Sequence, residues 1–176
     1  NASIFEPKPF LEIDYDEWFR YFEVNVISGV RLSRSLLPHM LKQKWGRIVF
    51  ISSESGIQTP PEMVHYGMTK TAQLAISRGI AETIPGSGVT VNAVLPGPTR
   101  SEGAVLFLEQ IAQERGMDVK KIEAEVLKTL RPSSLLKRMA SSEEVASLVV
   151  YLCGEPASAT TGAALRVDGG VVRAVT

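Results

Sequence analysis

The sequence has very few of the residues that build disulfides and metal centres. Its 176 residues include one cysteine, Cys153, and two histidines. A single cysteine excludes an internal disulfide, and so few thiol and imidazole groups argue against a structural zinc site. We therefore expect no metal, and we expect Cys153 to be a buried core residue.

The sequence also lacks an excess of charge of either sign and a long apolar run. Its 19 Lys and Arg residues balance 19 Asp and Glu residues, so nothing indicates a nucleic-acid or anionic membrane partner. No apolar run approaches the roughly 20 residues that span a membrane. No signal peptide is visible, although the first residue is Asn1 and not Met. The default expectation is a cytoplasmic protein.

What remains is the composition of an ordinary globular protein. Hydrophobic residues make up 44% of the sequence and charged residues 22%, which is typical of such proteins. The chain is long enough for one domain that buries around 70% of its unfolded surface. Because no repeat, low-complexity tract or linker interrupts it, we expect a single domain over residues 1–176.

Short apolar runs alternate with stretches of helical periodicity. Helices are expected at about 15–44 and 63–84, around 105–112, at 119–130 and after Ser141, and buried strands at 47–52, 89–95 and 163–167. This alternation predicts an α/β fold with a parallel sheet and right-handed crossovers.

Local signals mark the ends of several helices. Asp14 with Glu17, and Ser141 with Glu144, each resemble a helix N-cap with a reciprocal acid three residues later. Pro38 should kink or shorten the first helix, because proline lacks a backbone N–H.

One short stretch suggests chemistry. Tyr66 and Lys70 are four residues apart on an expected helix, so they lie on one face, one turn apart. The ordinary pKa of tyrosine is about 10, and a nearby positive charge lowers it. The pair is therefore a candidate acid/base device. Alone it is weak evidence, because chance produces Tyr-x-x-x-Lys in roughly one chain in three of this size.

The predicted topology supports this pair independently. Ligands of parallel α/β sheets bind outside the carboxyl ends of the strands. Ser53 follows the first strand, Pro96-Gly97 follows the second, and the helix that carries Tyr66 begins after the first strand and its loop. We expect these residues to meet at one edge of the sheet.

Six motifs occur in order along the chain. They are Asn1-Ala2-Ser3, Val24-Asn25-Val26, Ile51-Ser52-Ser53 followed by Gly56, Tyr66-x-x-x-Lys70, Val91 to Gly97 (VNAVLPG), and Thr161-Gly162 with Val167-Asp168-Gly169-Gly170. In this order and register the chain resembles the short-chain dehydrogenase/reductase family over nearly its whole length. The resemblance implies a Rossmann-like doubly wound parallel sheet, of which the three strands and their flanking helices are the C-terminal part.

The sequence departs from the family pattern at its start. The family's Gly-rich phosphate loop is absent, and so is the second strand, whose end usually selects NAD or NADP. We therefore expect residues 1–176 to represent the C-terminal two-thirds of the domain, without the pyrophosphate cradle and inactive alone. By resemblance, segment 102–138 is the variable substrate lid.

The resemblance implies a catalytic tetrad. Tyr66 would give or take the proton, and Lys70 would lower the pKa of Tyr66 and hydrogen-bond the nicotinamide ribose. Ser53 would donate a hydrogen bond to the substrate oxygen, and Asn25 would hold a water in a proton relay that ends at Lys70. The alternatives are that Ser53 is only a cap and that Asn25 is only a buried structural amide.

The resemblance also implies contacts with a cofactor, NAD or NADP. The cofactor-contacting residues would be Asn1, Ala2, Tyr66, Lys70, Pro96, Gly97, Thr99 and Ser101. Gly97 has no Cβ, so the backbone there could approach the nicotinamide closely. Asn1 and Ala2 would lie near the adenine-side ribose.

Two further features have ordinary interpretations that we prefer. His65 could pair with Ser53 as in a serine hydrolase, but the chain has no Gly-x-Ser-x-Gly and no clearly placed orienting acid. We interpret His65 as a loop or substrate-lining residue. Arg131, Lys137 and Arg138 could meet an acidic substrate group, but solvated charge is the preferred interpretation.

The sequence thus predicts an NAD(P)-dependent oxidoreductase that interconverts a small-molecule alcohol and carbonyl by hydride transfer, with Tyr66 as general acid/base. The resemblance implies a homodimer or homotetramer. Two alternatives remain open, namely a non-catalytic binding subunit and a lyase, epimerase or dehalogenase on the same scaffold.

Overall fold

The computed structural model describes residues 3–175 and shows an α/β fold. Its main sheet has three parallel strands in the order β1 (Gly46–Ile51), β2 (Val89–Pro96) and β5 (Ala164–Val167). Ile48 pairs with Val91, and Val94 pairs with Leu165. The three strands predicted from the sequence are confirmed, and so is their parallel arrangement.

The first predicted helix is continuous but contains a local irregularity. It consists of α1 (Tyr15–Phe22), a π-helical segment η2 (Glu23–Ile27) and α2 (Ser28–Gln43). Pro38 lies inside α2 and does not shorten it. The helix ends at Lys44, whose backbone is left-handed with φ of 53°.

The other helices follow the predicted order. They are α3 (Val64–Glu82), α4 (Glu102–Arg115), α5 (Val119–Leu130) and α6 (Ser142–Cys153), with short 3-10 turns η1 (Phe10–Glu12), η3 (Glu54–Gly56), η4 (Pro61–Met63) and η5 (Glu155–Ala157). Among residues 3–175, no helix has the length and apolar character needed to cross a membrane.

The two predicted helix caps differ in completeness. Ser141 and Glu144 form the full reciprocal capping box. Asp14 accepts a hydrogen bond from the backbone N–H of Glu17, but the carboxylate of Glu17 pairs with Lys8 instead of turning back to the cap. The ion pair with the Lys8 ammonium group holds the Glu17 carboxylate, which the local pattern predicted to bond back to the helix cap.

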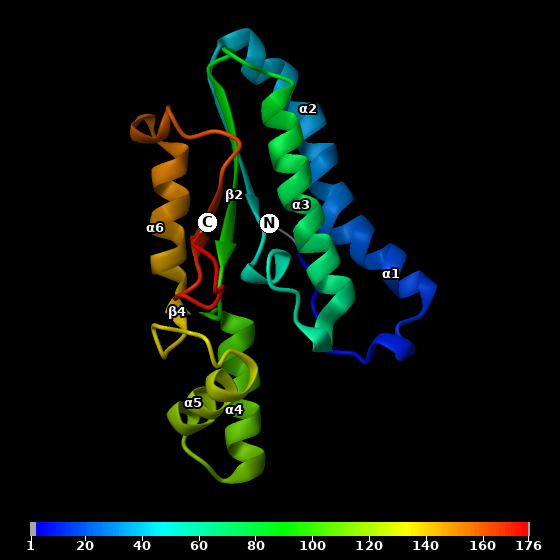
Figure 1. The fold of residues 1–176 in the computed structure, drawn as a ribbon, viewed down its shortest axis with the longest axis vertical. Coiled ribbons are helices and arrows are strands. Elements are labelled where there is room, and N and C mark those ends of the chain that lie inside the picture. Colours follow the sequence, from blue (N-terminus) through cyan, green and yellow to red (C-terminus); the bar gives the residue numbers. More distant parts are fainter. Residues whose placement is uncertain (1–2, 176) are drawn as a thin grey trace.

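Helices cover both faces of the sheet (Figure 1). One face of β2 packs with Phe50 and Ile84 and against α2 and α3, in a cluster that includes the fully buried Val91 and Leu95. The opposite face of β2 places Val94 against Leu152 of α6. Successive side chains of a strand point to opposite faces, so one strand supplies both cores. Each fully buried Val or Leu contributes about 1.5–3 kcal/mol.

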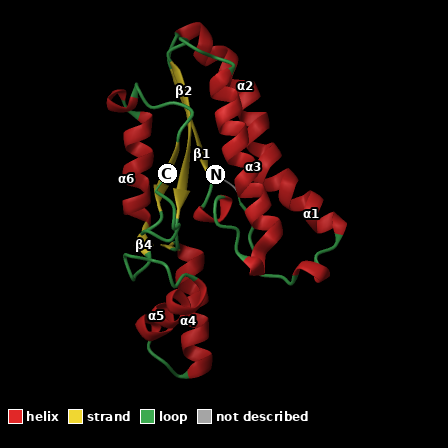
Figure 2. Cartoon of the chain, in the orientation of Figure 1, coloured by secondary structure: helices red, strands yellow, loops and turns green. Residues whose placement is uncertain are grey.

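Helices α4 and α5 lie beyond the carboxyl ends of the strands (Figure 2). They form a separate apolar cluster that includes Leu108, Ile122 and Leu127. Two short strands that sequence periodicity did not predict, β3 (Thr99–Arg100) and β4 (Ala140–Ser141), pair in parallel at the base of this unit. A two-residue strand is too short to leave a periodic signal.

The prediction for Cys153 is wrong. It is the last residue of α6 and is exposed. The apolar stripe of α6 that faces the sheet contains Leu148 and Leu152, and the next residue along the helix is turned about 100° away from Leu152.

Candidate active site

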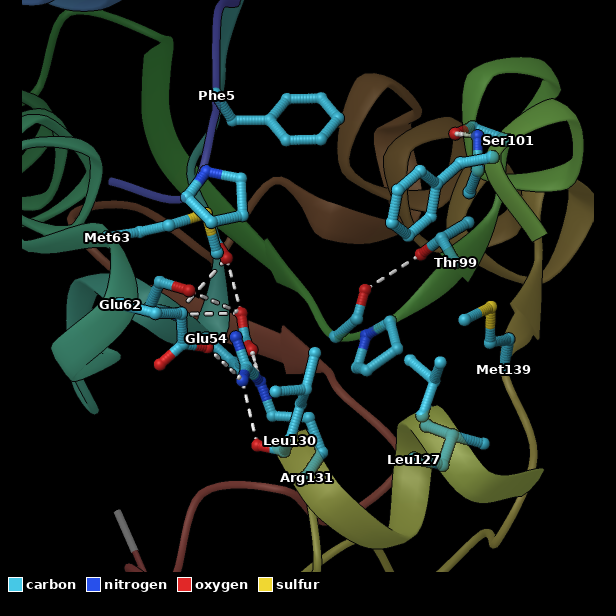
Figure 3. Close-up of a pocket in the computed structure, with 18 of the residues that line it drawn as sticks. Phe5, Glu54, Glu62, Met63, Thr99, Ser101, Leu127, Leu130, Arg131 and Met139 are labelled. Carbon is cyan, nitrogen blue, oxygen red and sulfur yellow. Dashed lines mark hydrogen bonds and ion pairs between the residues drawn. The ribbon is translucent and has the colours of Figure 1, made fainter. Parts of the chain in front are cut away.

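A cavity of about 350 Å³ opens at the carboxyl edge of the sheet. Ser53 follows β1, Tyr66 lies in the first turn of α3, and Gly97 follows β2, and all three line the cavity. The prediction that these segments converge at one edge is therefore confirmed. Thr99 and Ser101 also line the cavity, and Figure 3 shows them on the side facing Leu127 and Met139.

The opposite wall of the cavity comes from Phe5, which sequence reasoning did not connect with the site, and from the segment 102–138 that the resemblance named as the substrate lid. Phe5 packs near the Tyr66 ring, with 6.1 Å between the ring centroids. Phe107 and Leu108 of α4 line the cavity, together with Val126, Leu127 and Leu130 of α5. The reacting edge of the sheet therefore faces an apolar wall, which suits an uncharged organic group.

Lys70 lies one helical turn after Tyr66 on α3 and is not among the residues that line the cavity. Its Nζ is 5.4 Å from the centroid of the Tyr66 ring and donates a hydrogen bond of 3.0 Å to the carbonyl of Ile51. The side chain is buried, and loss of hydration lowers the pKa of Lys70 to about 8.

The environment of Tyr66 acts against the predicted effect of Lys70. Burial raises the pKa of Tyr66 to about 12, the Ser53 hydroxyl and Arg131 oppose this rise, and Glu54 adds to it. Lys70 is not among the groups that shift the pKa of Tyr66 here, so the expectation that it lowers this pKa stays a prediction. The ammonium group points to the Ile51 carbonyl, and desolvation of the phenolate outweighs the charges nearby.

Ser53 has a defined hydrogen-bond environment. Its hydroxyl donates to the carboxylate of Glu54 and accepts from the backbone N–H of Ser55 at 3.1 Å, which caps the short η3 turn. Ser53 therefore does cap a turn, but this does not show that capping is its only role. Capping does not exclude chemistry, because the same oxygen lines the cavity.

An ion network adjoins Ser53. Glu54 is buried, and its Oε1 lies 2.6 Å from Nε of Arg131, whose Nη1 lies 3.2 Å from Glu62 (Figure 3). Arg131 is therefore not a solvated charge as predicted, because two carboxylates hold it at the cavity. Exposed Arg138 pairs with Glu144 at the surface, as that prediction expects. Sequence reasoning missed Glu54 and Glu62, although a carboxylate directly after a strand-ending serine was a usable signal.

Asn25 is buried in the π-helical segment and makes several bonds. Its side-chain amide pairs with both backbone groups of Ile4, at 2.8 and 2.9 Å, and donates to Thr69 Oγ1 at 3.1 Å. Its backbone carbonyl accepts from Gln73. Asn25 thus has a structural role, and whether it also takes part in a water-mediated relay to Lys70 stays a prediction.

The residues after β2 have structural partners of their own. A Cβ at Gly97 would lie 2.5 Å from the carbonyl oxygen of Asp168, so only glycine fits beside the end of β5. Thr99 Oγ1 donates to the Gly97 carbonyl at 2.9 Å, and Ser101 caps α4. Gly97, Thr99 and Ser101 therefore have structural roles in addition to their predicted contacts with the cofactor. Pro96 ends β2, whereas Asn1 and Ala2 lie outside the described residues.

His65 is not part of the cavity, and its predicted role is wrong. Its ring is fully buried on α3, with its centroid 4.0 Å from that of Tyr21, and Nε2 is 3.7 Å from Glu17 Oε1. Burial lowers the pKa of His65. Neighbouring residues on a helix point about 100° apart, so Tyr66 faces the cavity while His65 faces α1. The hydrolase pairing fails too, because the Ser53 hydroxyl is bonded to Glu54.

Comparison with known proteins agrees with this geometry. A family model described as enoyl-(acyl carrier protein) reductase matches residues 1–172. YvaG of Bacillus subtilis, described as an uncharacterized oxidoreductase, is 47% identical over 175 residues, which are 99% of this chain and 66% of that protein. The 3-oxoacyl-[acyl-carrier-protein] reductase FabG of Aquifex aeolicus is 32% identical over 97% of this chain and 63% of its own length.

A solved structure has a similar fold. L-sorbose reductase from Gluconobacter frateurii, complexed with NADPH and L-sorbose, superimposes with a TM-score of 0.92 at 28% identity. The match covers 99% of this chain and 65% of that chain. The present chain thus spans about two thirds of the proteins it matches. With the family match over residues 1–172 and the convergence of Ser53, Tyr66 and Gly97 at one edge of the sheet, the chain belongs to the short-chain dehydrogenase/reductase family.

Proposed function

We propose that the whole protein is an NAD(P)-dependent oxidoreductase that interconverts an alcohol and a carbonyl in a small molecule. The observation that carries the proposal is the position of Tyr66. Its phenol shares a cavity with the Ser53 hydroxyl, and the Lys70 ammonium lies behind its ring. A carbonyl that accepts hydride needs a proton and a fixed hydrogen-bonding environment at its oxygen.

Tyr66 is the proposed general acid/base. Burial keeps its phenol protonated at neutral pH, so the residue is ready to donate a proton to a developing alkoxide. Lys70, with a pKa of about 8, is still mostly charged at pH 7 and stabilises the phenolate that remains. Asn25 and its neighbours support α3 from behind and would return a proton to Lys70 through water.

The residues at the carboxyl edge fit the nicotinamide end of NAD or NADP. Lys70 would supply an amine for a ribose hydroxyl, and Gly97, Pro98, Thr99 and Ser101 line the cavity, two of them with side-chain hydroxyls. The cofactor supplies the hydride. The NADPH complex of L-sorbose reductase, and a structure of a gluconate 5-dehydrogenase homologue from Beutenbergia cavernae with bound NADP, support this cofactor class.

The substrate class follows from the cavity. Its apolar wall accommodates the carbon skeleton of a small carbonyl or alcohol compound, and the polar groups gather near Ser53 and Tyr66. Segment 102–138 supplies much of that wall, which supports its proposed role as a substrate lid. A homodimer or homotetramer and a cytoplasmic location stay predictions.

Replacement of Tyr66 by phenylalanine in the whole protein tests the proposal. We expect loss of NAD(P)H-dependent carbonyl reduction by a factor of at least roughly 10²–10⁴, the usual contribution of a general acid, while NAD(P)H binding persists. Tyr15→Phe is a matched control, because Tyr15 is exposed on α1. Normal turnover by the Tyr66→Phe enzyme would refute the assignment and favour a non-catalytic or different activity.

A further inference from the structure

One corner of the cavity carries charged groups that the proposed proton transfer does not use. Glu54, Glu62 and Arg131 line the cavity together with Tyr66, and Figure 3 shows these three charged residues on one side of it, opposite Thr99. Two carboxylates meet one guanidinium there, so the corner is net negative. A few placed polar groups in a mostly apolar cavity usually fix the orientation of a bound molecule.

Glu54 uses its hydrogen-bonding capacity inside the protein. Its Oε1 accepts from Arg131 Nε at 2.6 Å, and its Oε2 accepts from the backbone N–H of Ser55 at 2.8 Å and from the Ser55 hydroxyl at 3.0 Å. Only 4% of Glu54 is exposed. A buried carboxylate is stable when charged and neutral donors surround it, so Glu54 serves to anchor Arg131.

Arg131 and Glu62 keep hydrogen-bonding atoms free. The guanidinium has five N–H donors in a fixed plane. Its Nε bonds Glu54, and its Nη1 bonds Glu62 Oε1 at 3.2 Å and the Leu130 carbonyl at 2.8 Å. Within residues 3–175, Nη2 of Arg131 and Oε2 of Glu62 have no partner, and neither atom is fully buried. The corner therefore offers a free donor and a free acceptor on two groups that an ion pair joins.

Both groups are held in place before any ligand binds. Glu62 lies in η4, just before α3 and Tyr66, and its backbone carbonyl accepts from the backbone N–H of Lys8 at 2.9 Å. Arg131 follows the last residue of α5 and is fixed by the buried carboxylate of Glu54. A ligand that bonds both groups loses little affinity to ordering them.

The donor and acceptor pattern limits the kind of ligand that fits. A hydroxyl group donates one proton and accepts through its lone pairs, so it can bond Oε2 of Glu62 and Nη2 of Arg131 at once. A carboxylate only accepts, and the net negative corner repels it. An ammonium group only donates, and Arg131 repels it. The arrangement therefore matches a neutral hydroxyl group.

We propose that Glu62 and Arg131 form a hydroxyl-binding subsite, and that the substrate is a neutral carbonyl compound with a further hydroxyl group, or the corresponding diol. Glu62 accepts the proton of that hydroxyl, Arg131 donates to its oxygen, and the carbon skeleton lies along the apolar wall. Glu54 is a positioning residue for Arg131. This inference rests on the proposed oxidoreductase function and narrows its substrate class.

Matched ketones test the subsite in the whole protein. The panel contains aliphatic hydroxyketones that differ in the separation of hydroxyl and carbonyl, each beside the ketone that lacks the hydroxyl. We expect kcat/KM for the best hydroxyketone to exceed that for its partner by at least roughly 10-fold, because the partner leaves charged groups unpaired. Glu62→Leu removes the acceptor and should bring this ratio within about threefold of unity.

The ratio separates recognition from a merely structural effect. A general loss of folding or catalysis lowers both rates and leaves their ratio unchanged. A wild-type protein without the preference, or a preference that survives Glu62→Leu, would overturn the inference.

Glu125→Leu is a matched control in the same lid segment. Glu125 pairs with Arg115 at 3.0 Å between α5 and α4, both side chains are about half exposed, and neither residue lines the cavity. The control should keep the wild-type ratio, because exposed ion pairs contribute little. Loss of the preference in Glu125→Leu as well would count against a subsite at Glu62.

Charged analogues and Arg131 variants test the signs of the groups. The wild type should reduce a keto acid and an aminoketone of matched length less efficiently than the hydroxyketone. Arg131→Met should lower the hydroxyl preference and improve the aminoketone relative to it. If Arg131→Met fails to fold, Arg131→Lys keeps a charge beside Glu54 but loses the second donor, and should lower the preference too. A wild-type preference for either charged analogue would refute the proposal.

Failure of the subsite is distinguishable from failure of the proposed function. If the wild type and Tyr66→Phe reduce the hydroxyl-free ketones equally, the oxidoreductase proposal fails. If Tyr66→Phe is inactive but the hydroxyl makes no difference to the wild type, or no hydroxyketone is reduced, only the subsite inference fails.

Discussion

Replacement of Lys70 by methionine should stabilise the folded protein while it abolishes catalysis. The Lys70 side chain is buried, with 3% of the residue exposed, and burial lowers its pKa from 10.5 to about 8. At pH 7, burial of the charged Lys70 ammonium group therefore destabilises the folded protein. Methionine has a similar length, no charge and a flexible side chain that fills the same space.

The magnitude follows from the pKa of Lys70 in the folded and unfolded states. The change from 10.5 to about 8 corresponds to about 3 kcal/mol at about 1.4 kcal/mol per tenfold change. The lost hydrogen bond to the Ile51 carbonyl offsets about 1–2 kcal/mol of this. We expect Lys70→Met to be more stable than wild type by about 1–2 kcal/mol at pH 7.

The advantage of Lys70→Met should depend on pH. Between about pH 8 and 10.5 the unfolded chain keeps the Lys70 proton that the folded chain has released, so the wild type gains stability as pH rises through this window. Lys70→Met has no such group, and its advantage should shrink and disappear above pH 8. Denaturant unfolding of both proteins at pH 7 and pH 10 measures the difference. A destabilised variant, or a difference independent of pH, would refute the reasoning.

Three other predictions address cofactor binding, packing and acid sensitivity. The 176-residue chain alone should bind NAD(P)H weakly by fluorescence titration, and micromolar affinity would contradict the expectation that the pyrophosphate cradle is absent. Gly97→Ala should cost about 1–3 kcal/mol in denaturant unfolding, because its Cβ would meet the Asp168 carbonyl at 2.5 Å; an unchanged midpoint would disprove the clash. His65→Phe should make unfolding less sensitive to acid, since burial lowers the pKa of His65 and the unfolded chain binds its proton first below about pH 6.5. Equal pH dependence of the two proteins would disprove it.

The ion network at the cavity also bears on the substrate. Two carboxylates, Glu54 and Glu62, already hold Arg131. The arginine therefore has no free charge for a substrate carboxylate, and the apolar wall opposite favours a neutral compound.

The sequence by itself determined the elements and the place where they meet. Short continuous apolar runs identified β1, β2 and β5, and apolar positions three or four residues apart identified the helices between them. Parallel strands bring their carboxyl ends to one edge, so Ser53, Tyr66 and Gly97 could be placed together before any coordinate was known. The Ser141 capping box was predictable for a similar reason, since its partners are three residues apart.

Only the tertiary structure decided the contacts between distant segments and the direction of individual side chains. Arg131 meets Glu54 across 77 residues of sequence, and no local pattern records such a pair. His65 turned inward to Tyr21, and Cys153 turned outward, because helix packing selects which residues of an apolar stripe are covered. The pKa values of Tyr66 and Lys70 likewise depend on burial, a property of the assembled fold that spacing of four residues does not determine.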